Sequence, residues 1–178
     1  MAAAASPELP DLWRIADALA RHHVDYLLVG GVAARAHGAD RLTYDVDCLP
    51  ARTEGNLDRL AMAMRDLHAR LRVEGLSDEE AERLPVQVSG STLARLEIAT
   101  WRTDAGDFDV LGGIPDRRGR HVSYDDLTAR AAELELDGIL VRVAALDDVI
   151  ASKEWADRPK DRAALDELRA LRPEAPEH

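Results

Sequence analysis

A short, almost wholly apolar run that ends in two consecutive glycines constrains the fold of this chain more than any other feature. The run covers residues 26–29 (YLLV), and Gly30 and Gly31 follow it directly. Such a run stopped by glycines is typical of a strand that is buried on both faces of a sheet. A short helix is predicted to begin directly after the glycines, at residues 32–37. The chain is therefore expected to fold around a buried strand that turns sharply into a helix.

The spacing of apolar residues predicts helices and strands along the rest of the chain. Helical spacing follows Pro10 to about His22 and recurs over residues 57–71, and an acidic, helix-prone insert covers residues 77–84. Turns at residues 104–106 and at Asp137-Gly138 indicate two hairpins. Further strands are predicted at residues 43–49, 96–101, 108–111, 134–136 and 139–143, and two last helices at residues 146–155 and 160–171, separated by Arg158-Pro159. This order predicts a mixed α/β fold with antiparallel pairs rather than a repeating parallel βαβ array.

The length of the chain predicts one core-forming domain. Its 178 residues fall within the ~100–200 residues that a single domain commonly occupies. We expect the domain to cover residues 9–172, since no low-complexity block, repeat or linker interrupts them. The two ends, residues 1–8 and 173–178, are rich in Ala, Pro and Glu and are predicted to be flexible tails.

Charge, hydropathy and cysteine content argue against several classes of protein. The formal net charge of −11 would repel a polyanion at long range, so the chain lacks the basic surface of a general nucleic-acid binder. No apolar run approaches the ~20 residues that cross a bilayer, and residues 2–5 lack the features of a signal peptide, so a cytoplasmic protein with no membrane partner is expected. Cys48 is the only cysteine, which rules out an internal disulfide, and it is expected to be a small buried apolar residue.

Two acidic residues lie two positions apart on the predicted strand at residues 43–49. Because side chains two apart on a strand share a face, Asp45 and Asp47 are expected to project together. Converging carboxylates repel each other unless a cation lies between them, and ligands that are all oxygen select a hard ion such as Mg²⁺ or Mn²⁺. Asp107 and Asp109 repeat the pattern on a later strand, so a third carboxylate is predicted to reach the same metal centre.

An acidic pattern of this kind also has a simpler interpretation. Alternating aspartates on a strand are most often its solvent-exposed face. The upstream glycines favour a metal site instead, because a glycine turn lets backbone amides approach a phosphate and the following helix directs its N-terminal amides at the same anion. Gly30-Gly31 and the Asp45–Asp47 pair therefore predict a phosphate-binding turn and metal ligands within one strand–turn–helix–strand unit.

The glycine pair and the acidic pair together resemble the signature of polymerase-β-like nucleotidyltransferases, in which two small residues after a strand precede an acidic pair on the next strand. Residues 30–47 resemble more specifically the AbiEii/MenT toxin branch, whose first motif has an Arg-x-Thr-x-Asp-x-Asp core. Residues 152–161 (SKEWADRPKD) are similar to later motifs of this branch, in which a helical lysine precedes an Arg-x-Lys-Asp segment. The residues that match the first core are Arg41, Thr43, Asp45 and Asp47.

This resemblance implies a minimal nucleotidyltransferase fold, a mixed sheet with antiparallel pairs flanked by helices, and roles for individual residues. Asp45, Asp47 and Asp109 would be catalytic ligands of Mg²⁺ or Mn²⁺. Lys153 would contact the triphosphate of the NTP co-substrate. Asp161 would orient Lys153 or act near the acceptor, unless it only stabilises the first turn of the last helix. The implied nucleotide-binding residues are Gly30, Gly31, Arg41, Thr43 and Lys153.

Two of these positions carry alternatives. Arg41 is expected either to touch a phosphate or to pair with a carboxylate such as Asp107. Gly31 departs from the serine that the family often has as its second small residue, so this chain lacks a hydroxyl that touches a terminal phosphate there.

The resemblance also implies an activity and partners. Members of the branch include toxins of toxin–antitoxin pairs, some of which transfer nucleotides to tRNA ends. We therefore expect transfer of a nucleoside monophosphate from an NTP to a hydroxyl, with release of pyrophosphate, tRNA as the acceptor and an antitoxin protein as partner. The alternatives are transfer to a small molecule or a protein, and a catalytically silent nucleotide-binding module, against which the three carboxylates argue.

Overall fold

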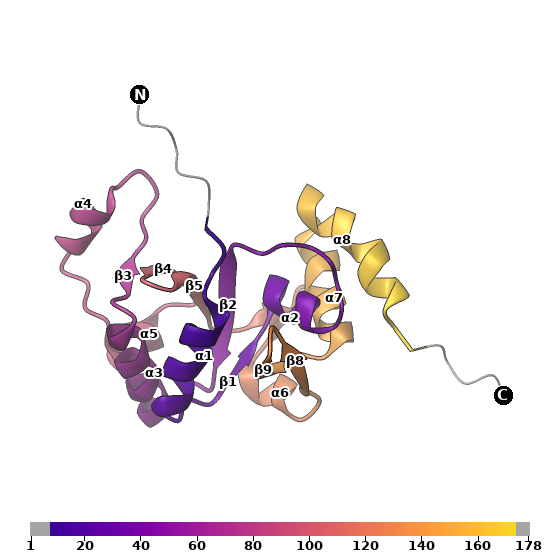
Figure 1. Cartoon of the computed structure of the whole chain (residues 1–178), viewed down its shortest axis with the longest axis horizontal. Helices are drawn as coiled ribbons and strands as arrows, with labels where there is room; N and C mark the ends of the chain where they lie inside the picture. The colour runs from indigo at the N-terminus through magenta and orange to yellow at the C-terminus, as the bar shows by residue number, and fades with distance from the viewer. Residues whose placement is uncertain (1–7, 174–178) are drawn as a thin grey trace.

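Seven strands form one mixed sheet in the computed structural model, which describes residues 8–173. Their order is β3-β4-β5-β2-β1-β9-β8 (Figure 1). The predicted flexible ends, residues 1–8 and 173–178, lie outside the described residues except for Glu8 and Pro173. The strands of the sheet are β1 (Tyr26–Leu28), β2 (Asp45–Pro50), β3 (Arg70–Leu71), β4 (Ile98–Thr103), β5 (Gly106–Leu111), β8 (Ala132–Leu136) and β9 (Ile139–Val143), and β6 (Ile114–Pro115) pairs separately with β7 (His121–Val122).

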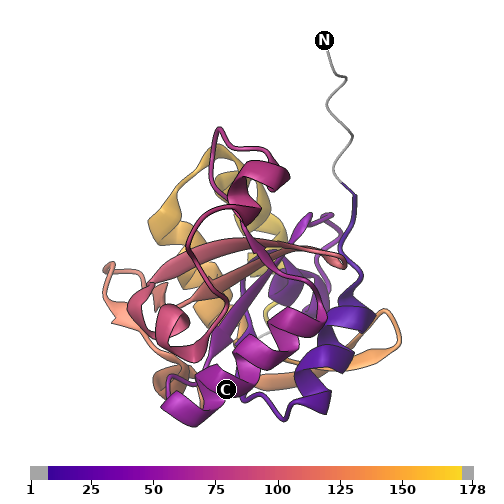
Figure 2. The ribbon, with the colours of Figure 1, turned by 90° about the vertical axis from the view of Figure 1, so that its left-hand side faces the viewer.

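Helices flank this sheet in two groups. In Figure 2, α1 and α3 lie side by side, whereas α2, α7 and α8 lie together beyond β2 in Figure 1. No helix within residues 8–173 has the length and apolar character that crossing a membrane requires. The helices are α1 (Leu12–Arg21), α2 (Gly30–Ala36), α3 (Glu54–Asp66), α4 (Asp78–Glu82), α5 (Gly90–Arg95), α6 (Tyr124–Thr128), α7 (Leu146–Ala156) and α8 (Pro159–Ala170).

The strand β2 lies at the centre of the sheet and sets the position of its aspartates. It pairs antiparallel with β1 and parallel with β5. In the parallel register Asp45 lies opposite Asp107, and Asp47 lies opposite Asp109. The aspartates of β2 and those of β5 therefore lie side by side on the same face of the sheet.

The reverse face of β2 and β5 is apolar and holds these strands in register. Val46, Cys48, Phe108 and Val110 are buried there, and Cys48 has the predicted character of a small buried apolar residue. Each large apolar side chain buried in this way contributes ~1.5–3 kcal/mol. A slip of one residue would exchange the two faces and bury the aspartates in the core. The same core cluster contains residues of α1 and α3, among them Ile15, Leu19, Leu57, Leu60 and Met64.

One buried polar side chain ties α3 to the start of β1 and the end of β2. Asn56 is fully buried. Its Nδ2 donates to the carbonyls of Asp25 (2.9 Å) and Ala51 (2.8 Å), and its Oδ1 accepts from the amide of Asp25 (2.8 Å). The side-chain amide therefore bonds three backbone groups at the ends of β1 and β2.

Most predicted elements are confirmed, and the differences have local causes. The predicted helix at residues 57–71 ends at Asp66, because His68 takes a left-handed conformation (φ 50°) and Leu71 instead pairs with Trp101 in β3–β4. The helix expected after the glycines begins at Gly30 itself. The hairpin at Asp137-Gly138, the helix α4 in the acidic insert and the last two helices lie where they were predicted.

Candidate active site

Three carboxylates converge at the centre of the sheet. Asp45 and Asp47 come from β2 and Asp109 from β5, and one oxygen of each lies within 4.8 Å of the others. The alternation of β2 and its parallel register with β5 bring them to one spot. The structure thus places together the three residues that were predicted as metal ligands.

The electrostatics of this group are those of a cation site. Burial, followed by repulsion from Asp45 and Asp109, raises the pKa of Asp47 to about 7. Burial also raises the pKa of Asp109, although the Thr100 hydroxyl acts in the opposite direction. The Oδ1 atom of Asp109 is buried and has no hydrogen-bond partner within residues 8–173. Because such an atom is costly to bury unless a cation binds it, these three residues fit a hard divalent ion.

The glycine pair packs directly against these carboxylates. Gly30 has a left-handed backbone (φ 59°), and a Cβ atom there would overlap the carboxylate of Asp47. A Cβ atom at Gly31 would lie 2.5 Å from Oγ1 of Thr43. A side chain at either position would therefore require the side chain of Asp47 or of Thr43 to move.

Thr43 orients the first carboxylate, and Arg41 lies across the cleft. Oγ1 of Thr43 is 3.0 Å from Oδ1 of Asp45, to which it donates, and 3.1 Å from its carbonyl oxygen. Arg41 donates from its guanidinium to the carbonyl of Lys160 at 3.3 Å, so it reaches the start of α8. The alternative that Arg41 pairs with Asp107 is wrong.

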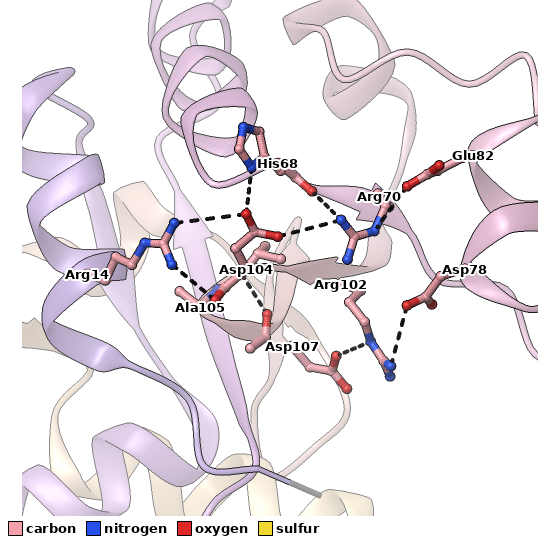
Figure 3. A network of polar contacts seen from close by, with 11 residues as sticks. Arg14, His68, Arg70, Asp78, Glu82, Arg102, Asp104, Ala105 and Asp107 are labelled. Atoms are coloured by element: carbon pink, nitrogen blue, oxygen red, sulfur yellow. Dashed lines mark hydrogen bonds and ion pairs between the residues drawn. The ribbon is translucent and has the colours of Figure 1, made fainter. Parts of the chain in front are cut away.

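Asp107 is held by other arginines and stays outside the group of three carboxylates. Its Oδ2 accepts from Arg72 at 2.7 Å, and its Oδ1 accepts from Nε of Arg102 at 3.1 Å. Arg102 also lies 3.8 Å from Asp78 of α4, and so forms part of the ion-pair network at this edge of the sheet (Figure 3). Of the two aspartates on β5, Asp109 has a buried oxygen without a hydrogen-bond partner within residues 8–173, whereas both oxygens of Asp107 accept from arginines.

A set of cationic side chains forms the opposite wall of the site. Nζ of Lys153 on α7 lies 3.3 Å from Oδ1 of Asp161, which is fully buried. Arg158, which precedes α8, places its Nε 2.5 Å from Oδ2 of the same carboxylate. Burial alone would raise the pKa of Asp161, but the Arg158 hydrogen bond and the Lys153 charge outweigh it, so the pKa lies below its ordinary value. Of the three roles considered for Asp161, the hydrogen bond to Lys153 is compatible with orienting Lys153, which stays a prediction.

The carboxylates and cations face one cleft of about 440 Å³. Every predicted site residue lines it. The cleft also includes Arg158 and Lys160, to which the sequence resemblance gave no role although both belong to its Arg-x-Lys-Asp segment. Leu42 and Tyr44 line it too, and no sequence pattern indicated them. The predicted residues among its lining are Gly30, Gly31, Arg41, Thr43, Asp45, Asp47, Asp109, Lys153 and Asp161.

Several solved structures share this arrangement of strands and helices. LnuA, a lincosamide antibiotic adenylyltransferase with lincomycin bound, matches with a TM-score of 0.57 and 12% identity over 91% of this chain and 96% of that chain. The antibiotic-resistance factor ANT(2'')-Ia matches in solution with a TM-score of 0.56 and 13% identity over 90% of this chain and 80% of that chain. The complex of ANT(2'')-Ia with adenylyl-2''-tobramycin matches with a TM-score of 0.54 and 14% identity over 90% of this chain and 91% of that chain.

These matches establish the fold. The chain has a nucleotidyltransferase fold, as the resemblance to polymerase-β-like enzymes implied. No family model matches the sequence, and no curated protein sequence does. The AbiEii/MenT branch within this group therefore stays a prediction.

Proposed function

We propose that the protein is a metal-dependent nucleotidyltransferase that moves a nucleoside monophosphate from an NTP to a hydroxyl acceptor and releases pyrophosphate. One observation carries the proposal. A group of three carboxylates and a set of cationic side chains face each other across one cleft, so a metal ion and a polyphosphate are both accommodated there.

The carboxylate wall is assigned to the metal. Asp45, Asp47 and Asp109 would hold Mg²⁺ or Mn²⁺, and Thr43 would keep the first of these carboxylates in place. When bound, the metal neutralises charge on the phosphates and activates the attacking hydroxyl. Gly30 keeps the site open, since any side chain there would occupy the space of the Asp47 carboxylate.

The cationic wall is assigned to the triphosphate. Lys153 is a compact charge, and its bond to the buried Asp161 limits its rotamers before the nucleotide arrives. Arg41, Arg158 and Lys160 line the same wall and supply further positive charge. Asp161 is a positioning residue in this scheme, because it acts through Lys153 and Arg158.

A small molecule is the acceptor that the observations favour. ANT(2'')-Ia and LnuA were solved with an adenylylated antibiotic and with an antibiotic, respectively, and the net charge of −11 disfavours a polyanion. We therefore propose a small hydroxyl compound in place of the tRNA acceptor and the antitoxin partner that the sequence resemblance implied.

Labelled nucleotides test the proposal. The protein is incubated with Mg²⁺ and each α-labelled NTP, once with total RNA and once with a panel of small hydroxyl compounds. Label should pass to a small molecule with the wild type and with Asp107→Asn, which lies in register with Asp45 outside the group, but not with Asp47→Asn. Mg²⁺-dependent nucleotide binding without any product would contradict the proposal and indicate a silent binding module. Label in RNA alone would restore the tRNA acceptor.

A further inference from the structure

A second cleft, of about 420 Å³, opens at the outer edge of the sheet. Its lining residues include Leu71 of β3 and Ile98 of β4. These strands are on the left of Figure 1, whereas α7 and α8 are on the right with β2 and β5 between them. The residues that line it are Leu71, Arg72, Val86, Thr92, Arg95, Leu96, Ile98, Ala99 and Thr100.

The cleft exists because β3 is shorter than the strand it pairs with. The last hydrogen bond between them joins the amide of Arg72 to the carbonyl of Thr100 at 2.9 Å, and β4 begins two residues earlier, at Ile98. Since backbone groups two residues apart point to the same side of a strand, the N–H and C=O of Ile98 face this edge. The chain then returns through residues 86–96 and closes the outer wall.

One lining residue of this cleft, Thr100, lies beside the carboxylate group. Thr100 lies opposite Asp109 in the β4–β5 register, and Asp109 lies opposite Asp47 in the β5–β2 register. Residues paired in this way share a face, and neighbouring strands are ~4.8 Å apart. A molecule that occupies the cleft beside Thr100 therefore lies one strand away from Asp109, on the side opposite the cationic wall.

The residues that line the cleft indicate which kind of ligand it would bind. Five of its side chains are apolar, and Ile98 is 68% exposed although it is large and branched. Exposed apolar surface beside a catalytic group is typical of a binding site. Its charged lining residues are Arg72, which is paired with Asp107 at 2.7 Å, and Arg95, which makes no ion pair with any carboxylate of residues 8–173. The cleft thus offers apolar contact and the unpaired positive charge of Arg95, and no carboxylate is among its lining residues.

We propose that this edge cleft binds the acceptor, and that the acceptor is a small hydroxyl compound with an apolar body and a neutral or anionic character. The inference rests on the proposed function and names its substrate class. The acceptor oxygen forms a bond to the α-phosphorus, the bond from that phosphorus to the bridging oxygen breaks, pyrophosphate leaves with the electron pair, and the hydroxyl proton passes to solvent. Amino sugars with several ammonium groups are disfavoured by the unpaired charge of Arg95.

Three probes with one scaffold test both the place and the charge preference. The dissociation constants of 4-ethylphenol, 4-hydroxyphenylpropionate and tyramine are measured on the protein with Mg²⁺ and a non-hydrolysable NTP analogue. The neutral and anionic probes should bind at least about tenfold more tightly than the cationic one. Ile98→Glu should weaken the anionic probe by about tenfold or more, whereas Leu140→Glu, at a side chain that is also 68% exposed, should not.

The outcomes separate this inference from the proposed function. Tightest binding of tyramine, unchanged binding of the anionic probe to Ile98→Glu, or no binding of any probe at millimolar concentration would overturn the edge cleft as the acceptor site. Binding of the NTP analogue is recorded separately, and both glutamate variants should retain it. If the wild type does not bind the NTP analogue, the proposed function itself is wrong, whether or not the probes bind.

Discussion

Gly30 and Asp47 lie so close together that a single added Cβ atom would overlap the carboxylate. The two residues are seventeen positions apart, and the antiparallel pairing of β1 with β2 brings them together. The first turn of α2 and the acidic strand therefore form one packed unit, in which the glycine and the aspartate depend on each other.

Gly30→Ala should abolish metal-dependent activity. The added atom would displace Asp47, and the left-handed backbone would cost a further ~1–2 kcal/mol. Gly138→Ala is the matched control, because Gly138 also has a positive φ but a Cβ there meets nothing within 4 Å. Gly30→Ala should lose more stability in denaturant melts than Gly138→Ala, which has only the backbone cost, and only Gly30→Ala should lose Mg²⁺-induced stabilisation. Equal Mg²⁺ responses would refute the packing relationship.

The metal-free protein should lose stability as the pH rises from about 4 to about 7, through Asp47. Burial first, and then Asp45 and Asp109, raise the folded-state pKa of this group from 3.8 to about 7. The folded state therefore holds the proton more tightly than the unfolded chain, so the contribution to stability is complete below pH 4 and falls as the carboxylate ionises. Melts in a chelator should show this slope in the wild type and a flatter one in Asp47→Asn.

Mg²⁺ should reverse that loss, because it binds the ionised carboxylates and its binding displaces protons. The increase in melting temperature on adding Mg²⁺ should be larger at pH 7.5 than at pH 5. A response independent of pH would mean that Asp47 is not among the ligands.

Lys153→Gln should lower kcat/KM for the NTP by ~10²–10³-fold while the domain stays folded. Arg158 still neutralises the buried Asp161 in this variant, so little stability is lost. Asp161→Asn should lower kcat/KM for the NTP and also lower the free energy of unfolding by ~1–3 kcal/mol, because Lys153 and Arg158 both lose a charged partner. Steady-state kinetics and melts distinguish the two. If Asp161 had only a role in the helix start, its variant would keep the KM for the NTP.

Asn56→Leu should destabilise the protein by ~1–3 kcal/mol without a direct effect on transfer. The substitution leaves the backbone groups of Asp25 and Ala51 without their buried partner. Denaturant unfolding measures the loss, and activity per folded molecule should equal that of the wild type.

Local pattern predicted much of the fold and of the candidate site. Alternation on β2 was enough to place Asp45 and Asp47 on one face, and the turn residues Asp137-Gly138 were enough to locate a hairpin. Both features depend only on residues that are close together in the sequence, and this is why they could be predicted from it.

Pattern could not distinguish Asp109 from Asp107, because both alternate in the same way on β5. The choice depends on Arg72 and Arg102, which hold Asp107, and Arg72 lies thirty-five positions away in the sequence. The early end of α3 depends in the same way on the pairing of Leu71 with Trp101, which no helical periodicity reveals.

Cys48 gives this protein an intrinsic reporter. Its sulfhydryl is on the reverse side of the strand that carries Asp45 and Asp47, where burial, followed by the charge of Asp47, holds the pKa of the thiol well above its usual range. A neutral, enclosed thiol reacts with a disulfide reagent only while β2 is separated from its neighbours. The rate at which Cys48 is labelled therefore measures how often β2 separates from its neighbouring strands, and no cysteine has to be introduced for this measurement.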